Sequence, residues 1–180
     1  MKRKTRHSIN EPGDAHELTF TCYRRCSFFE DDALKNSLLK SIAVARKRHN
    51  FLVWAYVIMP NHVHLLIHPN ATEYKMAVLL KAIKQPFSQA LIYEWKSVGD
   101  SRLLETKYAA NEHRFWQPGG GYDRNLTSAE AIWSAIEYIH ENPVRRGLVE
   151  TATDWLWSSA RFYEQMDGVA FEVDQCDVWR

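Results

Sequence analysis

Two runs of β-branched, aromatic and aliphatic residues set the strongest constraint on how this 180-residue chain can fold. FLVWAYVIM (51–59) and HVHLLIH (62–68) are separated only by Pro60 and Asn61. Both runs have the composition and length of β-strands, and proline followed by asparagine is typical of a tight turn. The sequence therefore predicts a β-hairpin over residues 51–68.

Periodic patterns on both sides of the hairpin predict the other elements. Alternating apolar and polar residues indicate a strand, whereas apolar residues at every third or fourth position indicate an amphipathic helix. Pro86 interrupts or kinks one helix, and the run from Gly119 to Gly121 predicts a turning loop. The elements predicted in this way are a strand over 16–25, helices over 31–49, 74–85 and 87–95, strand pieces over 114–116 and 122–126, and a helix that begins after Thr127 or Ser128.

The order strand, helix, hairpin, helix, strand predicts an α+β fold of the ferredoxin-like (βαββαβ) type. Its antiparallel sheet would carry two helices on one face, with an additional C-terminal helix. With 46% apolar residues, the chain can fill one core but not comfortably two. We therefore expect a single domain over 1–180, with a flexible basic N-terminus (1–14), a core (15–150) and a C-terminal tail (151–180) whose last fifteen residues are loosely held.

Composition and charge narrow the class of protein. No apolar run is long enough to span a bilayer, and the basic start lacks the hydrophobic segment of a signal peptide, so we expect a cytoplasmic protein without a membrane partner. The net charge of +1 gives no sign of a polyanionic partner, but local basic clusters could contact phosphates. Each cluster is also compatible with a solvated turn or helix end. The candidate DNA-binding residues are Lys2, Arg3, Lys4, Arg24, Arg25, Arg145 and Arg146.

The second run of the hairpin carries a candidate metal site. In a strand, His62 and His64 project from one face, about 7 Å apart, while the alternate residues Val63, Leu65 and Ile67 face the core. Two imidazoles at this spacing can converge on one metal ion, although the pair alone does not specify which metal. The alternative is that both histidines simply line the solvent face of a half-exposed strand.

The last predicted helix carries a candidate nucleophile. Tyr138 and Asn142 lie four residues apart, and hence on one helix face, and Pro143 is expected to end the helix. The side-chain amide of Asn142 would then be free, and its oxygen is a hard ligand suited to Mg²⁺ or Mn²⁺. The alternatives are that Tyr138 is a core residue with its hydroxyl at the rim and that Asn142 caps the following turn.

Two strings closely resemble the single-tyrosine transposases of the HUH nuclease superfamily, in particular their REP-associated branch: MPNHVHLL (59–66) and YIHENPVRRGLV (138–149). Similarities at 16–23, 115–125 and 157–159 extend the resemblance over nearly the whole chain. The resemblance implies that His62 and His64 are metal ligands and that Tyr138 is the nucleophile. Asn142 stands where relatives place a third, polar ligand, which in many of them is glutamine.

The resemblance also implies a bacterial source and hairpin-bearing, single-stranded DNA as the substrate. Cleavage would give a 5′-phosphotyrosine and a free 3′-hydroxyl that can later rejoin strands, with Mg²⁺ or Mn²⁺ as cofactor. A lone tyrosine on this helix predicts one adduct at a time. The REP-associated branch suggests a monomer, and a dimer remains possible.

The roles of some single residues have more than one interpretation. Trp116 or Tyr122 could stack on bases, although core packing is the simpler role for the tryptophan. His140 lies about 200° around the helix from Tyr138, so we favour a metal over His140 as the activator of the Tyr138 hydroxyl.

A ferredoxin-like module that binds single-stranded nucleic acid without catalysis is the main alternative function. A zinc hydrolase ranks last, because no third histidine or carboxylate lies in motif spacing.

Overall fold

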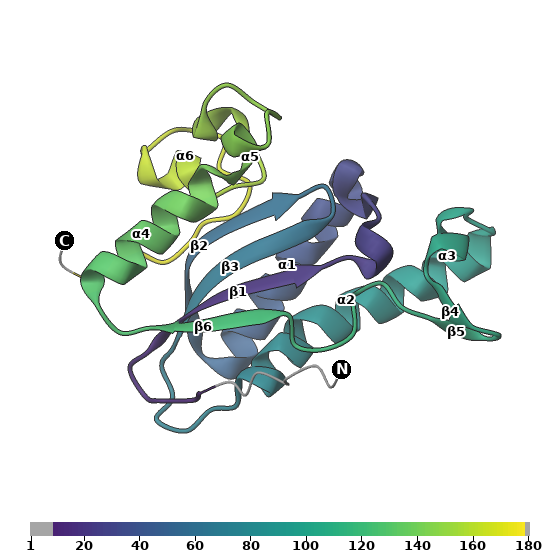
Figure 1. Ribbon diagram of the computed structural model, residues 1–180, viewed down its shortest axis with the longest axis horizontal. Coiled ribbons are helices and arrows are strands. Elements are labelled where there is room, and N and C mark those ends of the chain that lie inside the picture. Colours follow the sequence, from purple (N-terminus) through teal and green to yellow (C-terminus); the bar gives the residue numbers. More distant parts are fainter. Residues whose placement is uncertain (1–8, 179–180) are drawn as a thin grey trace, which may run out of the picture.

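A computed structural model describes residues 9–178 and shows a four-stranded sheet with helices on both faces (Figure 1). The strands are β1 (Ala15–Thr21), β2 (Phe51–Met59), β3 (His62–Pro69), β4 (Lys107–Ala109), β5 (Glu112–His113) and β6 (Tyr122–Leu126), and the helices are α1 (Asp32–His49), α2 (Met76–Val98), α3 (Arg102–Glu105), α4 (Ala129–His140), α5 (Asn142–Arg145) and α6 (Ala160–Tyr163). The main sheet has the order β2-β3-β1-β6, and all neighbouring strands are antiparallel. Strands β4 and β5 form a separate two-stranded sheet.

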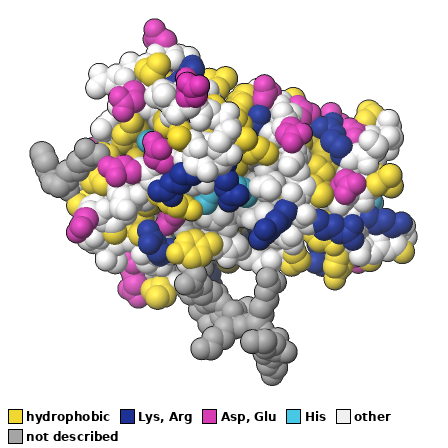
Figure 2. Space-filling model, turned by 45° about the horizontal axis from the view of Figure 1, so that its top comes forward, with side chains coloured by type: hydrophobic (Ala, Val, Ile, Leu, Met, Phe, Trp, Pro, Cys, Tyr) yellow, Lys and Arg dark blue, Asp and Glu magenta, His cyan; other side chains and the backbone are white. Residues whose placement is uncertain are grey.

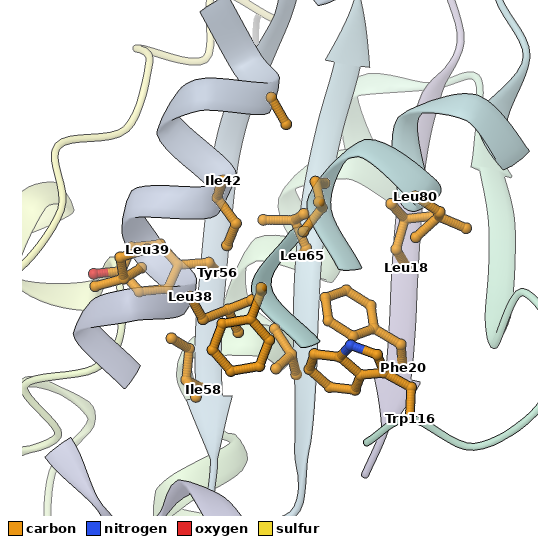
Figure 3. Packing of buried hydrophobic residues seen from close by; sticks show 14 of the residues in the cluster. Leu18, Phe20, Leu38, Leu39, Ile42, Tyr56, Ile58, Leu65, Leu80 and Trp116 are labelled. Carbon is orange, nitrogen blue, oxygen red and sulfur yellow. The ribbon is translucent and has the colours of Figure 1, made fainter. Parts of the chain in front are cut away.

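One face of the sheet packs against α1 and α2 and forms the larger hydrophobic core (Figures 1 and 3). Alternation along the strands produces this face, because every second residue of β3, from Val63 to Ile67, is fully buried there. Leu38 and Ile42 of α1 meet the strands in Figure 3, and Leu80 of α2 lies beside Leu18. The predicted hairpin and the buried side of β3 are confirmed.

The opposite face is partly covered by α4. Ile132, Ile136 and Ile139 form its apolar stripe, and they pack in a second core with residues of β2 and with Leu66 of β3. Ser128 caps the helix, since its side chain accepts a hydrogen bond from the Ala131 amide. The predicted α+β class, with an antiparallel sheet, two helices on one face and an additional helix, is therefore confirmed.

Several predicted boundaries differ from the structure. The first strand ends at Thr21 instead of Arg25, because a 3₁₀ turn follows in which Arg24 and Arg25 adopt left-handed backbone angles (φ 53° and 60°). Residues 114–116 form no strand, and only Trp116 bridges to Cys22. Residues 114–116 belong instead to the connection between β5 and β6.

Pro86 does not divide the second helical pattern. The helix α2 is continuous from Met76 to Val98 and contains the proline. Proline removes one backbone hydrogen bond from a helix, yet Ile83, Phe87 and Leu91 on either side of it are buried in the core. The burial of this apolar face keeps the two halves in one helix.

The C-terminal tail is held more firmly than we expected. Val173 and Cys176 are buried, the amide of Asp174 donates to the Val53 carbonyl oxygen, and its carboxylate pairs with Arg46 at 2.6 Å. The prediction of loosely held residues at 166–180 is therefore wrong as far as the structure describes them. These contacts explain the difference, because the tail packs along the free edge of β2.

At the other end of the chain, residues 9–14 are also tied down. The side chain of Asn10 accepts a hydrogen bond from the Met76 amide, and the Glu11 carbonyl oxygen accepts one from the Tyr74 hydroxyl. Lys2, Arg3 and Lys4, predicted to bind DNA, lie outside the described residues. No helix within 9–178 combines the length and the apolar character needed to cross a membrane.

Candidate active site

The two predicted ligand histidines lie together on the α4 face of β3. The ring centroids of His62 and His64 are 4.9 Å apart, and the rings are nearly perpendicular, at 80°. His64 is 6% exposed, whereas His62 is half-buried. The strand register thus brings the two imidazoles together, as the sequence predicts.

A hydrogen bond fixes the orientation of each imidazole. His62 Nδ1 lies 2.6 Å from Asn61 Oδ1, and His64 Nδ1 lies 2.9 Å from Thr19 Oγ1. Because the Asn61 oxygen can only accept, His62 carries its proton on Nδ1 and keeps a lone pair on Nε2. Metal-binding histidines usually donate their second ring N–H to such a partner. His62 Nε2 is therefore a candidate ligand atom, and His64 Nε2 is the second when His64 Nδ1 donates to the Thr19 hydroxyl.

Both histidines are neutral at physiological pH. Burial, followed by the charges of Arg146 and Arg25, lowers the pKa of His62 to about 4. Burial, followed by the charges of His62 and Arg146, lowers the pKa of His64 to about 3. A metal ion would consequently compete little with protons for these nitrogens near pH 7.

Tyr138 lies against this pair. Its ring is edge-to-face with His64, with centroids 5.7 Å apart and an interplanar angle of 85°. The buried stripe of α4 anchors the helix, and Tyr138 itself is 40% exposed. The Tyr138 ring also contacts Arg145, whose guanidinium lies 4.7 Å from the ring centre. A candidate nucleophile and a candidate metal pair thus adjoin, and the Tyr138 side chain is accessible from solvent.

Asn142 differs in part from its predicted environment. The helix α4 ends at His140, and Pro143 lies in the first turn of the short helix α5, which begins at Asn142. Asn142 is buried, and its Nδ2 donates to the Tyr138 carbonyl oxygen at 3.1 Å. The amide is therefore not free as predicted, because this bond joins the two helices. Its oxygen is still of the chemical type that Mg²⁺ and Mn²⁺ prefer.

The donor set fits one divalent cation with incomplete protein ligation. Within residues 9–178, no group of three or more histidine, cysteine, aspartate or glutamate side chains could hold a metal ion. Two neutral imidazoles with oriented Nε2 atoms remain, and any third protein ligand must be of another type, such as the Asn142 amide oxygen. Fewer protein ligands leave coordination positions for substrate oxygens.

Arginines from distant parts of the chain surround the site. The charges of Arg25 and Arg146 both act on His62, and Arg145 lies over Tyr138. Figure 2 shows histidine side chains near the centre of one face, with lysine and arginine side chains grouped around them. Arg24, by contrast, lies over the ring of Tyr23. The structure thus brings three of the predicted DNA-binding residues to the histidines and the tyrosine.

The two predicted stacking aromatics have different environments. Trp116 is 7% exposed and belongs to the larger core, where it packs edge-on against Phe20. The prediction that it could stack on bases is wrong, and the simpler role of core packing is confirmed. Tyr122 is 37% exposed.

Two site residues escaped the sequence analysis, Thr19 and Asn61. Asn61 belongs to the hairpin turn, where its turn propensity hides a second role. Thr19 lies directly opposite His64 in the β1–β3 register, a pairing that local periodicity does not reveal. The alternation of β1 indicates which face Thr19 occupies, but only the register identifies its partner.

His140 points to a separate set of contacts. Its Nε2 lies 2.8 Å from Ser159 Oγ, and its ring packs against Tyr163 with centroids 5.2 Å apart. Burial lowers the pKa of His140 to about 4, so it is neutral near pH 7. These contacts are structural, and they agree with the helical angle that separates His140 from Tyr138.

We expect His140→Ala to lower the stability of the fold without removing the chemistry. Loss of the Ser159 partner and of the ring contact should cost about 1–3 kcal/mol in the free energy of unfolding, measured by urea denaturation. Per folded molecule, cleavage and metal affinity should stay close to wild type. A variant that binds metal normally but no longer cleaves DNA would show instead that His140 takes part in catalysis.

Comparisons with known proteins identify the family of this chain. The family model described as "Transposase IS200 like" matches residues 14–142, which include all four of His62, His64, Tyr138 and Asn142. The chain therefore belongs to the IS200-like transposase family.

Two similar proteins carry the REP-associated name. A protein of Haemophilus influenzae, named as a REP-associated tyrosine transposase, is 27% identical over 113 residues, or 63% of this chain and 61% of that protein. The match thus spans less than two thirds of that relative's length. A solved structure described as a REP-associated tyrosine transposase bound to a REP hairpin has a TM-score of 0.66 and 19% identity, and the alignment covers 98% of this chain and 94% of that one. The two share the fold.

Proposed function

We propose that this protein is a metal-dependent transposase that cleaves and rejoins hairpin-bearing, single-stranded DNA, with Tyr138 as the nucleophile. The observation that carries the proposal is the edge-to-face contact of Tyr138 with His64, at 5.7 Å, beside the paired imidazole of His62. A nucleic-acid-binding module without catalysis would not require two oriented, neutral imidazoles next to a tyrosine.

The charge of the site suits a phosphodiester. The negative charge of a phosphodiester repels nucleophiles, and the guanidinium groups of Arg25, Arg145 and Arg146 would offset this repulsion while they orient the strand. His62, His64 and the Asn142 oxygen would hold Mg²⁺ or Mn²⁺, which when bound neutralises phosphate charge and orients the phosphorus. In this proposal the arginines bind and orient the strand, and the neutral histidines keep a ring nitrogen available to bind the metal ion.

In the proposed step, the Tyr138 hydroxyl loses its proton to solvent and its oxygen attacks the phosphorus in line. The new bond joins Tyr138 Oη to phosphorus, and the bond from phosphorus to the 3′ oxygen breaks. The leaving oxygen takes up a proton and becomes a free 3′-hydroxyl, while the 5′ side stays attached as a phosphotyrosine. The reverse attack by a 3′-hydroxyl rejoins strands without an external energy source.

The substrate class follows from the relatives. The structural relative at 19% identity is described as bound to a REP hairpin, and the sequence relative carries the REP-associated name. We transfer this class to the present chain, and the contact of Tyr138 with the histidine pair supports the transfer.

A covalent adduct on a denaturing gel tests the function. The protein would be incubated with labelled hairpin DNA that carries single-stranded flanks, in Mg²⁺, in Mn²⁺ or in EDTA. The proposal expects a shifted, protease-sensitive band in the presence of metal only. Binding of the DNA without an adduct, under any metal and with any hairpin, would favour the non-catalytic module.

Two substitutions of Asn142 distinguish a role as metal ligand from a role in the junction of α4 and α5. We expect Asn142→Ala to weaken Mn²⁺ binding by on the order of tenfold in a calorimetric titration, because it removes an oxygen ligand. Asn142→Asp is the matched variant, since it keeps an oxygen but loses the Nδ2 donor to Tyr138. It should bind Mn²⁺ at least as well as wild type. Equal loss in both variants would assign Asn142 to the helix junction alone.

A further inference from the structure

The helix α4 covers only part of its sheet face. It packs on β2 and β3 (Figure 1). Tyr122 and Arg124 of β6, on the same face, remain exposed. The register identifies this face, because Tyr122 lies opposite Thr19, whose hydroxyl contacts His64. An open strip of sheet therefore runs beside the candidate active site.

Tyr122 lies in one row with the metal pair. In the sheet, His64 pairs with Thr19 on β1, and Thr19 pairs with Tyr122 on β6. Two strand spacings place the backbone of Tyr122 about 10 Å from that of His64. Its ring is 37% exposed. A strand of DNA held at His64 would reach Tyr122 by continuing across this row.

The tight loop before β6 fixes Tyr122 at the end of the row that His64, Thr19 and Tyr122 form. Gly121, which precedes Tyr122, has φ +84°, and a Cβ at this position would lie 2.2 Å from the Thr19 carbonyl oxygen. A side chain at 121 is therefore incompatible with the close approach of the loop to β1. The glycine run predicted as a turning loop thus sets the position of Tyr122 beside Thr19.

At the other end of this loop lies a cation without a counter-charge. Lys84 of α2 is half-buried over the rings of Phe20 and Trp116, and its Nζ lies 3.4 Å from the Gly119 carbonyl oxygen. None of the carboxylates in residues 9–178 forms a salt bridge with it. Burial lowers the pKa of Lys84 to about 8. A phosphate would supply the missing negative charge.

We propose that Tyr122 and Lys84, at the two ends of the loop Gly119–Gly121, form a second nucleotide-binding element, here named the sheet edge. Tyr122, on the α4 face, stacks on an unpaired base of the strand that continues from the active site. Lys84, on the α2 side of the same loop, binds a phosphate further along that strand, where the strand rounds the edge of the sheet. The proposal rests on the proposed function for the identity of the ligand, which is single-stranded DNA. Stacking on an aromatic ring tolerates any base, so the sheet edge contributes affinity and alignment more than sequence preference.

Fluorescence anisotropy in EDTA tests the stacking, because no cleavage is expected there. The probe is a labelled hairpin with a single-stranded flank, compared with the same hairpin trimmed of its flank. Tyr122→Leu should raise the dissociation constant for the flanked probe about 5- to 150-fold, and that for the trimmed probe little. Tyr122→Phe keeps the ring and should bind as wild type. Tyr93→Leu, which changes a tyrosine of α2 that is 76% exposed, is the matched control.

The salt dependence of binding tests the lysine. Each phosphate contact on a single strand contributes about 0.7 to the slope of log K against log salt. Lys84→Gln should therefore flatten this slope by about 0.7 for the flanked probe, whereas Lys84→Arg and Tyr122→Leu should leave it unchanged. Lys81→Gln alters an exposed lysine on the preceding turn of α2 and serves as the control.

The outcomes distinguish this proposal from the proposed function. Wild-type affinity for the flanked probe in both Tyr122→Leu and Lys84→Gln would overturn the sheet edge, even if wild-type protein forms an adduct. Equal weakening on flanked and trimmed probes, or a lowered melting temperature in Tyr122→Phe, would also overturn it, since the role would then be structural. Binding that behaves as expected, without any adduct in metal, would contradict the catalytic function alone.

Discussion

Replacement of Tyr138 by phenylalanine is expected to reduce the covalent adduct by at least about a thousandfold, to below detection. The substitution removes only the hydroxyl. The ring that packs edge-on against His64 and under Arg145 is retained, so neither the fold nor the binding of DNA should change. Adduct formation on a denaturing gel and anisotropy with the same hairpin, measured in parallel, separate the two effects.

The control for this substitution is another tyrosine. Tyr93→Phe changes an exposed hydroxyl on α2 and should leave the adduct at the wild-type level. An adduct that persists in Tyr138→Phe would mean that another residue attacks the phosphorus, and the proposed function would fail in its central assignment. Loss of DNA binding along with the adduct would point to a damaged site instead of a missing nucleophile.

The second large effect concerns the metal pair. In wild-type protein, Mn²⁺ at a hundred times its dissociation constant should stabilise the fold by about 2.7 kcal/mol, which corresponds to a rise of about 5–10 °C in melting temperature. The double variant His62→Ala, His64→Ala should show no such rise and no adduct in either metal. Removal of two neutral imidazoles leaves no charge unpaired, and the metal-free protein should remain folded.

His68→Ala provides the comparison for the metal pair. His68 lies on the same strand and face, but its ring stacks on Trp54 at 4.7 Å instead of joining the pair. This variant should retain the Mn²⁺-induced rise in melting temperature. A rise that survives in the double variant would place the metal elsewhere in the chain, and one that disappears in His68→Ala would extend the ligand set.

The parts of the fold that the sequence predicted are those set by local periodicity. The hairpin, the buried side of β3 and the apolar stripe of α4 depend on residues two to four positions apart, and their patterns are unambiguous. The first strand was predicted too long because its alternation continues through Tyr23, while the left-handed angles of Arg24 and Arg25 leave no trace in that pattern.

The rest of the site depends on contacts between distant residues. The pairing of Thr19 with His64 requires the register of two strands that are far apart in the chain, and the approach of Arg25 and Arg146 to His62 requires α5 to lie near the end of β1. The sequence marked both arginines as basic clusters but could not bring them together. The contacts of Asp174 in the C-terminal tail with Val53 and Arg46 likewise join residues that are far apart in the chain.

The contact between His64 and Tyr138 has a kinetic consequence. Both residues belong to one chain, and α4 is anchored to the same sheet that carries the histidines. In the structure of one chain the two halves of the site are therefore already together. For the proposed cleavage within one chain, we expect the initial rate to rise with the first power of protein concentration and the specific activity not to fall on dilution.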